Sequence, residues 1–282
     1  MIDLSVLPFA VPDLPAAEYH NTWPALSHSG MVKLLDTCPA QFHYDSHHPK
    51  DDDTPAKEIG TAYHMLVLEN PRFHTTYDAL PEGVSLSTKA GKDARDAIVA
   101  AGKTPLKFEV WETLRAMKLA IDAHPFVGPL FNRIGMSEVS LFWKDPASEV
   151  ICRARPDFLP AESRLIVDLK SALDASPEAL SKQMSQYGYN VEAALYTEGA
   201  YACGIRDTDA AFVFVAQQKD PPYIITAWTP DDDAMKLGRR QVQKARALYA
   251  DCLRTNTWPP YVTEVAQIGL PAWAKRQLEQ ME

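Results

Sequence analysis

The stretch "RARPDFLPAESRLIVDLKSA", Arg153–Ala172, decides the fold and raises a question about charge. Its second half is rich in aliphatic residues and is typical of a buried β-strand. Asp168 and Lys170 nevertheless lie in or directly beside this apolar run. Because side chains two apart in a strand share a face, we expect both charges to project together while Val167 and Leu169 point into the core.

A second carboxylate precedes this strand. Asp157 follows Pro156 at the end of the preceding predicted strand, and ten residues separate it from Asp168. If the two strands pair, two carboxylates and Lys170 share a small volume, and such carboxylates suit Mg²⁺. A metal held there would polarise a scissile phosphate, while Lys170 would stabilise the charge that develops. The alternative is an exposed ion pair that contributes at most about 1 kcal/mol.

Outward from this stretch, the spacing of apolar residues predicts the other elements. Helices are expected at residues 56–69, 88–101, 107–123, 176–202 and 231–254, and a short helix is expected to start at Ser27 or Ser29. Strands are expected at residues 137–143, 149–159, 164–170, 210–217 and 223–230. The first three would form an antiparallel meander, with the charged residues at a sheet edge. This order predicts an α/β or α+β fold with a mixed central sheet flanked by helices.

The chain is expected to contain one domain and an arm. Residues 1–25 are rich in proline and lack periodicity, so they are predicted to be extended, which leaves 26–282 as a single domain. Residues 47–58 are predicted to form an exposed loop. Because there is neither a basic N-terminal region nor a run of eighteen apolar residues, we expect a soluble, cytoplasmic protein.

The net charge of -9 at first opposes binding to nucleic acid. Residues 1–60 carry nine acids and three lysines, however, so the remainder of the chain is nearly balanced. Lys236, Arg240 and Lys244 are spaced by four and would share one helix face that could follow a DNA backbone, although most such faces are simply solvated.

Two arginines and four cysteines complete the candidate residues. Arg153 and Arg155 share a strand face that leads to Asp157 and suit phosphate contacts, with a structural ion pair as the alternative. No two cysteines have the spacing of a zinc ribbon, a redox motif or a disulfide framework, so buried free thiols are expected. The absence of a Walker A motif predicts no requirement for ATP.

The pattern Pro156-Asp157, ten residues, Asp168-Leu169-Lys170 resembles the motif of the PD-(D/E)XK nuclease superfamily. Longer stretches resemble, in the same order, the nuclease domain of RecE-type exodeoxyribonuclease VIII. These stretches are "EIGTAYHMLVLENP", "CRARPDFL", "IVDLKSALDAS", "YNVEAALYTEGA" and "LPAWAKRQLEQ". The resemblance extends from about Leu26 to the C-terminus.

The resemblance implies roles for individual residues. His64, in the G-T-A-x-H helix, corresponds to a metal ligand, as do Asp157, Asp168 and the backbone carbonyl of Leu169. Lys170 corresponds to the catalytic lysine.

Two acidic residues are less clearly assigned. Glu138, at the start of a predicted strand, could add a carboxylate to the metal site or could be a solvated strand end. Related recombination nucleases carry Gln-x-x-x-Tyr on the helix after the lysine, and Tyr196 fits this element as a DNA-binding residue, but Glu192 replaces the amide. Glu192 could adjust the metal site or accept hydrogen bonds from Tyr196 or an arginine, and Gln186 is a poorly spaced substitute.

The resemblance also implies an activity. It predicts a Mg²⁺-dependent exonuclease, with Mn²⁺ as a substitute, that digests linear double-stranded DNA processively from 5′ to 3′ for a RecT-type annealing protein. A toroidal homotetramer is expected. No iron–sulfur cluster is expected, because Cys38, Cys152, Cys203 and Cys252 are not clustered as in the relatives that bind one. The alternatives are a structure-selective or single-strand endonuclease on the same site, and a catalytically inactive module that binds DNA ends or proteins.

Overall fold

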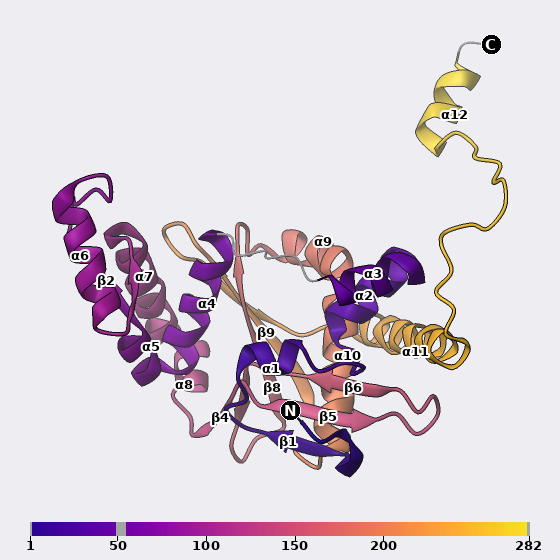
Figure 1. Ribbon diagram of the computed structural model, residues 1–282, viewed down its shortest axis with the longest axis horizontal. Helices are drawn as coiled ribbons and strands as arrows, with labels where there is room; N and C mark the ends of the chain where they lie inside the picture. The colour runs from indigo at the N-terminus through magenta and orange to yellow at the C-terminus, as the bar shows by residue number, and fades with distance from the viewer. Residues whose placement is uncertain (1, 49–54, 281–282) are drawn as a thin grey trace.

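The computed structural model describes residues 2–48 and 55–280 (Figure 1). The helices are α1 (Ala16–His20), α2 (His28–Asp36), α3 (Pro39–His47), α4 (Pro55–Leu68), α5 (Asn70–Thr76), α6 (Lys89–Ala100), α7 (Phe108–Ala123), α8 (Val127–Phe131), α9 (Pro177–Tyr187), α10 (Tyr189–Ala202), α11 (Asp232–Thr255) and α12 (Ala272–Glu279). The strands are β1 (Phe9–Val11), β2 (Tyr77–Ala79), β3 (Thr104–Leu106), β4 (Gly135–Ser137), β5 (Ser140–Lys144), β6 (Ile151–Ala154), β7 (Phe158–Pro160), β8 (Leu165–Ala172), β9 (Ala211–Gln218) and β10 (Ile225–Trp228). None of the described helices is both long and apolar enough to cross a membrane.

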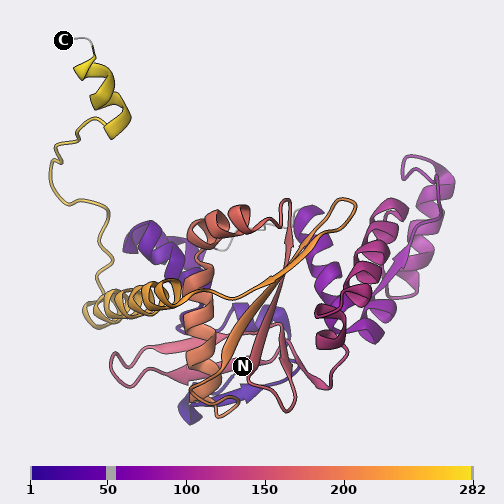
Figure 2. The same cartoon turned by 180° about the vertical axis from the view of Figure 1, so that it is seen from behind.

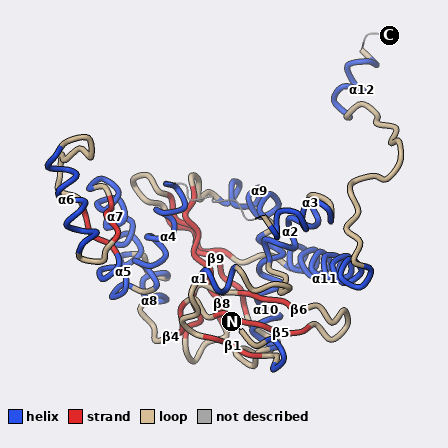
Figure 3. Tube along the Cα trace, viewed as in Figure 1, coloured by secondary structure: helices blue, strands red, loops and turns tan. Residues whose placement is uncertain are grey.

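The central sheet has five strands in the order β10-β9-β8-β7-β4. Strands β8 and β9 are parallel and the other pairs are antiparallel, so the predicted mixed sheet and fold class are confirmed. The expectation that Asp168 and Lys170 lie at a sheet edge is wrong, because β8 is the middle strand. Figure 3 shows helices on either side of these strands.

The two faces of β8 enter different parts of the core, as the alternation predicted. Val167 and Leu169 are fully buried among apolar side chains of α4 and α7. On the opposite face, Ile166 packs in a core formed with α2, α10 and α11. Asp168 and Lys170 share the face of Ile166, so apolar packing on both sides fixes the strand from which the two charges project.

A second sheet, in the order β1-β5-β6, begins where two predicted strands break. The strand expected at 137–143 is interrupted at Glu138, whose φ of 52° is left-handed, and the strand expected at 149–159 is interrupted between Ala154 and Phe158. The predicted meander is therefore antiparallel but divided between two sheets. The two breaks are adjacent, because the Glu138 amide donates to the Asp157 carbonyl at 3.0 Å.

The single long helix expected at residues 176–202 is also wrong. Gly188 takes a φ of 69° and separates α9 from α10. A β-carbon at this position would lie 2.5 Å from Val32 Cγ2, so the close approach of α2 also favours glycine here. The predicted helix starts at Ser176 and Ser27 are confirmed. Ser176 caps α9 and Ser27 caps α2, and each hydroxyl accepts a hydrogen bond from a backbone amide of the first turn.

The N-terminal segment is not simply extended, contrary to expectation. Its β1 pairs antiparallel with β5, with Phe9 opposite Phe142, and α1 follows. Division of the chain at residue 26 stays a prediction. Of the loop expected at 47–58, residues 49–54 lie outside the described part of the chain. At the other end, the chain beyond α11 runs away from the body of the protein to α12 (Figures 1 and 2).

Candidate metal and catalytic site

Three residues bring possible metal ligands to one point. His64 on α4, together with Glu138 and Asp157 at the two strand breaks, offer ligand atoms that all lie within 4.8 Å of one another. His64 Nδ1 and Asp157 Oδ2 are 3.5 Å apart. The sequence left two interpretations of Glu138, a carboxylate beside the metal site or a solvated strand end. The structure favours the first, because the carboxylate lies beside the other two possible ligands.

The local fold fixes these carboxylates. Asp157 Oδ2 accepts a hydrogen bond of 2.6 Å from the amide of Leu169, so β8 holds the carboxylate at the end of β7. Glu138 owes its position to the left-handed backbone at the crossing between sheets, a conformation that is costly for a residue other than glycine. Surrounding structure must therefore enforce this turn.

Asp168 takes part in a second group beside the first. The Lys170 ammonium lies 2.7 Å from Asp168 Oδ2, although the contact lacks the angles of a hydrogen bond, and it donates to Glu192 Oε1 at 3.0 Å. Asp168 and Glu192 are only 2% and 4% exposed. The role of Glu192, which the sequence left open, includes direct contact with the predicted catalytic lysine.

Burial raises the pKa of three carboxyl groups in this cluster, those of Glu138, Asp157 and Asp168. Burial raises the pKa of Glu138 to about 7. Burial, with the nearby charge of Glu192, raises that of Asp168 to about 6. Burial and the charge of Asp168 raise the pKa of Asp157 well above its ordinary value. Burial opposes the charge on Lys170, but the carboxylates of Asp168 and Glu192 outweigh it and raise the pKa of the ammonium.

The donor set fits a divalent cation. Burial lowers the pKa of His64 to about 4, so its imidazole is neutral at pH 7 and can offer a lone pair. Asp157, Asp168 and Glu192 lie around the ammonium of Lys170, while Glu138 lies near Arg155. Glu192 Oε2 is buried without a hydrogen-bond partner among the described residues. A bound cation would offset this excess of negative charge. Two carboxylates and an imidazole are ordinary ligands for such an ion.

His64, Glu138 and Asp157 line a cavity of about 510 Å³. Tyr196, predicted from its position on the helix after Lys170, lines this cavity and is largely buried. The predicted backbone ligand, Leu169, lies next to the same point, because its amide donates to Asp157 Oδ2. The catalytic roles of Asp157, Asp168 and Lys170 stay predictions, as do the metal-ligand roles of His64, Asp157, Asp168 and Leu169.

The two arginines hold the N-terminal segment. Arg153 Nη1 donates to the carbonyl of Thr22 at 2.9 Å, and Arg155 Nη2 donates to that of Leu14 at 3.0 Å. Both guanidinium groups lie over the Tyr19 ring, 5.1 and 4.1 Å from its centroid. These contacts are hydrogen bonds and cation–π contacts rather than the ion pair considered as an alternative, and phosphate binding by either arginine stays a prediction.

The basic face on α11 is exposed as its spacing indicated. Lys236, Arg240 and Lys244 are solvent-exposed on this helix, and DNA binding by them stays a prediction. Tyr189 was not identified from the sequence as a residue of the site. Its ring centroid lies 5.0 Å from the Lys170 ammonium. It precedes Glu192 by three residues, so helical spacing could have identified it as a neighbour on the same face.

Comparisons with known proteins bear on the fold. Residues 27–269 match the family described as "PDDEXK-like domain of unknown function (DUF3799)". The structure of a protein named "Putative exonuclease" from Eubacterium rectale gives a TM-score of 0.54 at 11% identity, over 94% of this chain and 98% of that chain. A phage related exonuclease from Haemophilus somnus 129PT gives a TM-score of 0.34 at 12% identity, over 85% and 99%. No curated protein matches the sequence. The first structural likeness shows a shared fold.

Proposed function

The chain belongs to the family of PDDEXK-like domains of unknown function (DUF3799), and on that premise we propose that it hydrolyses phosphodiester bonds of DNA. The proposed activity is that of a Mg²⁺-dependent exonuclease, with Mn²⁺ as a substitute, that digests linear double-stranded DNA from 5′ to 3′. One observation carries this proposal: ligand atoms of His64, Glu138 and Asp157 converge beside the Asp168–Lys170 pair.

Each residue has a distinct part in the proposed reaction. His64, Glu138 and Asp157 would hold the metal, with Asp168 and the Leu169 carbonyl as further candidate ligands. Bound Mg²⁺ would supply Lewis-acid polarisation of the phosphate and acidify water. The Lys170 ammonium, charged because two carboxylates flank it, would stabilise negative charge that grows on the phosphate oxygens. Glu192 would keep this ammonium in place.

The biological setting is proposed from the sequence resemblance. The 3′ single-stranded tails left by digestion would pass to a RecT-type annealing protein during recombination in the cytoplasm. A toroidal homotetramer would let a protein of net charge -9 enclose DNA, provided that basic residues such as Lys236, Arg240 and Lys244 line the ring.

The first test incubates the full chain with 5′-labelled linear duplex and with a closed circle, in Mg²⁺ or EDTA. Metal-dependent loss of the linear DNA alone, abolished by Asp168→Ala, is the expected result. Loss of the circle would indicate an endonuclease instead. Survival of both DNAs in Mg²⁺, in a folded sample at low salt, would reject the nuclease and leave a DNA-end or protein-binding module.

A further inference from the structure

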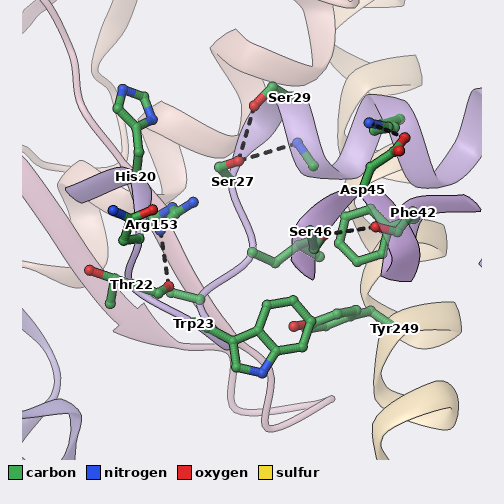
Figure 4. A pocket seen from close by; sticks show the side chains of 15 residues that line it. His20, Thr22, Trp23, Ser27, Ser29, Phe42, Asp45, Ser46, Arg153 and Tyr249 are labelled. Carbon is green, nitrogen blue, oxygen red and sulfur yellow. Dashed lines mark hydrogen bonds and ion pairs between the residues drawn. The ribbon is translucent and has the colours of Figure 1, made fainter. Parts of the chain in front are cut away.

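A second cavity, of about 440 Å³, adjoins the catalytic one (Figure 4). His20 lines both cavities, so the two share a wall. Arg153 lines the second cavity and Arg155 lines the catalytic one, with Tyr19 beneath both guanidinium groups. The N-terminal segment that these arginines hold therefore separates two adjacent binding spaces.

The wall of the second cavity opposite His20 is aromatic. Trp23 is 43% exposed, and its ring makes edge contacts with Tyr249 and His47 at centroid distances of 6.0 and 4.9 Å. Phe42 also lines the cavity, and Figure 4 shows Trp23 and Tyr249 together on one side. These contacts hold the indole in place while leaving part of it accessible.

The polar groups of this cavity are paired with one another. Lys33 and Asp45 form an ion pair of 2.5 Å, and the hydroxyls of Ser27 and Ser29 lie 3.2 Å apart. Both cationic side chains that line the cavity already have partners, because Lys33 pairs with Asp45 and Arg153 donates to the carbonyls of Tyr19 and Thr22. A flat, uncharged group with polar edges, such as a nucleobase, suits aromatic and hydroxyl-bearing walls.

We propose that this cavity, the base pocket, holds an unpaired nucleobase of the substrate strand next to the scissile phosphate. The inference rests on the proposed nuclease function and extends it to the recognition of a strand end. A strand end whose nucleotide leaves the duplex stack could bring its phosphate to the buried Asp157, and the base exposed in this way then needs a surface on which to stack. Trp23 provides that surface.

The test uses duplexes that carry the fluorescent base 2-aminopurine at the 5′ end of one strand or in the middle of the duplex. If the proposed function is correct, full-length Asp168→Ala protein in Mg²⁺ binds the DNA but does not cut it. The terminal probe alone should change in fluorescence as its base leaves one stack for another. Trp23→Ala should abolish this change and weaken binding of the frayed end about tenfold.

Two further variants separate stacking from folding. Trp273→Ala removes another exposed tryptophan, on α12 away from the cavity, and should leave the signal intact. Ser46→Trp fills the base pocket from an exposed position and should reduce the signal without altering Trp23. Thermal melting checks each variant.

An unchanged terminal signal in Trp23→Ala and Ser46→Trp would overturn the base pocket. If wild-type protein cuts linear DNA while this signal is absent or insensitive to both variants, only the pocket inference fails. If the signal depends on Trp23 but wild-type protein never cuts, the proposed hydrolysis fails and the cavity remains a pocket for DNA ends. Failure to bind or cut any DNA would reject both proposals.

Discussion

Helix α10 contributes to two clusters of charged side chains that differ in their balance of charge. Glu192, near its start, contacts Lys170 in the candidate catalytic site, where several carboxyl groups face one ammonium. Glu198, further along, contacts Arg246, which also binds Asp145 at 2.6 Å. The guanidinium thus meets two carboxylates, and its Nη1 and Nη2 are both bonded.

The pKa shifts express this difference. Burial raises the pKa of Asp145, but hydrogen bonds from Ser148 and the charge of Arg246 outweigh it, so the net shift is downward. At the candidate site, burial raises the pKa of Glu138 and Asp168, and no nearby cation reverses the shift. Where a cation bonds the carboxylates, as Arg246 does, their ionised form is stabilised, and we call such a cluster compensated. Where the carboxyl groups outnumber the nearby cations and their pKa values are raised, protons or a metal ion bind favourably, and we call the cluster uncompensated. The first kind suits structure and the second suits binding.

The largest expected effect comes from removing the ammonium of the candidate site. Lys170→Gln should reduce the rate of DNA cleavage roughly 10²- to 10³-fold, because charge on the phosphate loses its partner. Initial rates on linear duplex at saturating Mg²⁺ measure this. Lys182→Gln, which removes an exposed lysine paired with Glu178 on α9, is the matched control and should cleave normally. Equal rates for the two variants would contradict a catalytic role for Lys170.

Breaking the compensated cluster should affect stability instead. Arg246→Met leaves Asp145 and Glu198 without their cation and should lower the free energy of unfolding by about 3 kcal/mol. Denaturant unfolding measures the change, and Arg239→Met, at an exposed position of the same helix, is the control. Cleavage per folded molecule should remain normal. A stable Arg246→Met protein with impaired cleavage would show that the two clusters are not functionally separate.

The sequence predicted the part of the candidate site that depends on local spacing, but not the part that depends on contacts between distant segments. Strand alternation and the Asp157 to Lys170 spacing are local features, and they correctly brought Asp157, Asp168 and Lys170 together. The position of Glu138 depends on a left-handed turn between two sheets, which no local pattern indicated. Likewise, Arg153 binds a carbonyl more than a hundred residues earlier in the chain, so its partner could not be read from spacing.

The same limit applies to the fold. Most helices and the mixed sheet followed from periodicity because each buries a regular apolar face. Strand β1 is short and its partner, β5, lies far along the sequence, so proline content suggested an extended arm instead. Gly188 interrupts a helix whose apolar pattern continues, since the cause is partly the approach of Val32 from another helix.

Acidity should affect the stability of the metal-free protein in a defined direction. The pKa of Glu138 is raised from 4.5 to about 7 and that of Asp168 from 3.8 to about 6, so the folded state binds protons more tightly than the unfolded chain. This contribution to stability is fully present below the unfolded values and is lost as the pH rises through the folded ones. His64 and His28, whose pKa values burial lowers to about 4, change stability in the opposite direction over this range. The effect of the two carboxyl groups is therefore a difference between proteins: in EDTA, the Tm of the wild type should fall by on the order of 5 °C more between pH 5.5 and 8 than that of a variant without these carboxyl groups.

Mg²⁺ should remove most of this fall, because it replaces the protons as the compensating charge. The double variant Glu138→Gln and Asp168→Asn should lack this component of the pH dependence in EDTA and should respond little to Mg²⁺. Thermal melting at both pH values provides the measurement. The same dependence of Tm on pH in the wild type and in the double variant, in EDTA, would mean that other groups control stability in this range.

The smallest expected effect concerns Glu192, which links the uncompensated site to α10. Glu192→Ala should lower kcat about tenfold with little change in KM, because Lys170 loses a positioning contact outside the metal ligands. Glu192→Gln retains an oxygen that can accept from the lysine, so it should keep kcat within about threefold of wild type. If the amide is as damaging as alanine, the negative charge of Glu192 matters more than its hold on Lys170. In that case the excess of carboxylates itself contributes to catalysis, and the site differs more clearly from the Arg246 cluster, where one guanidinium bonds both carboxylates.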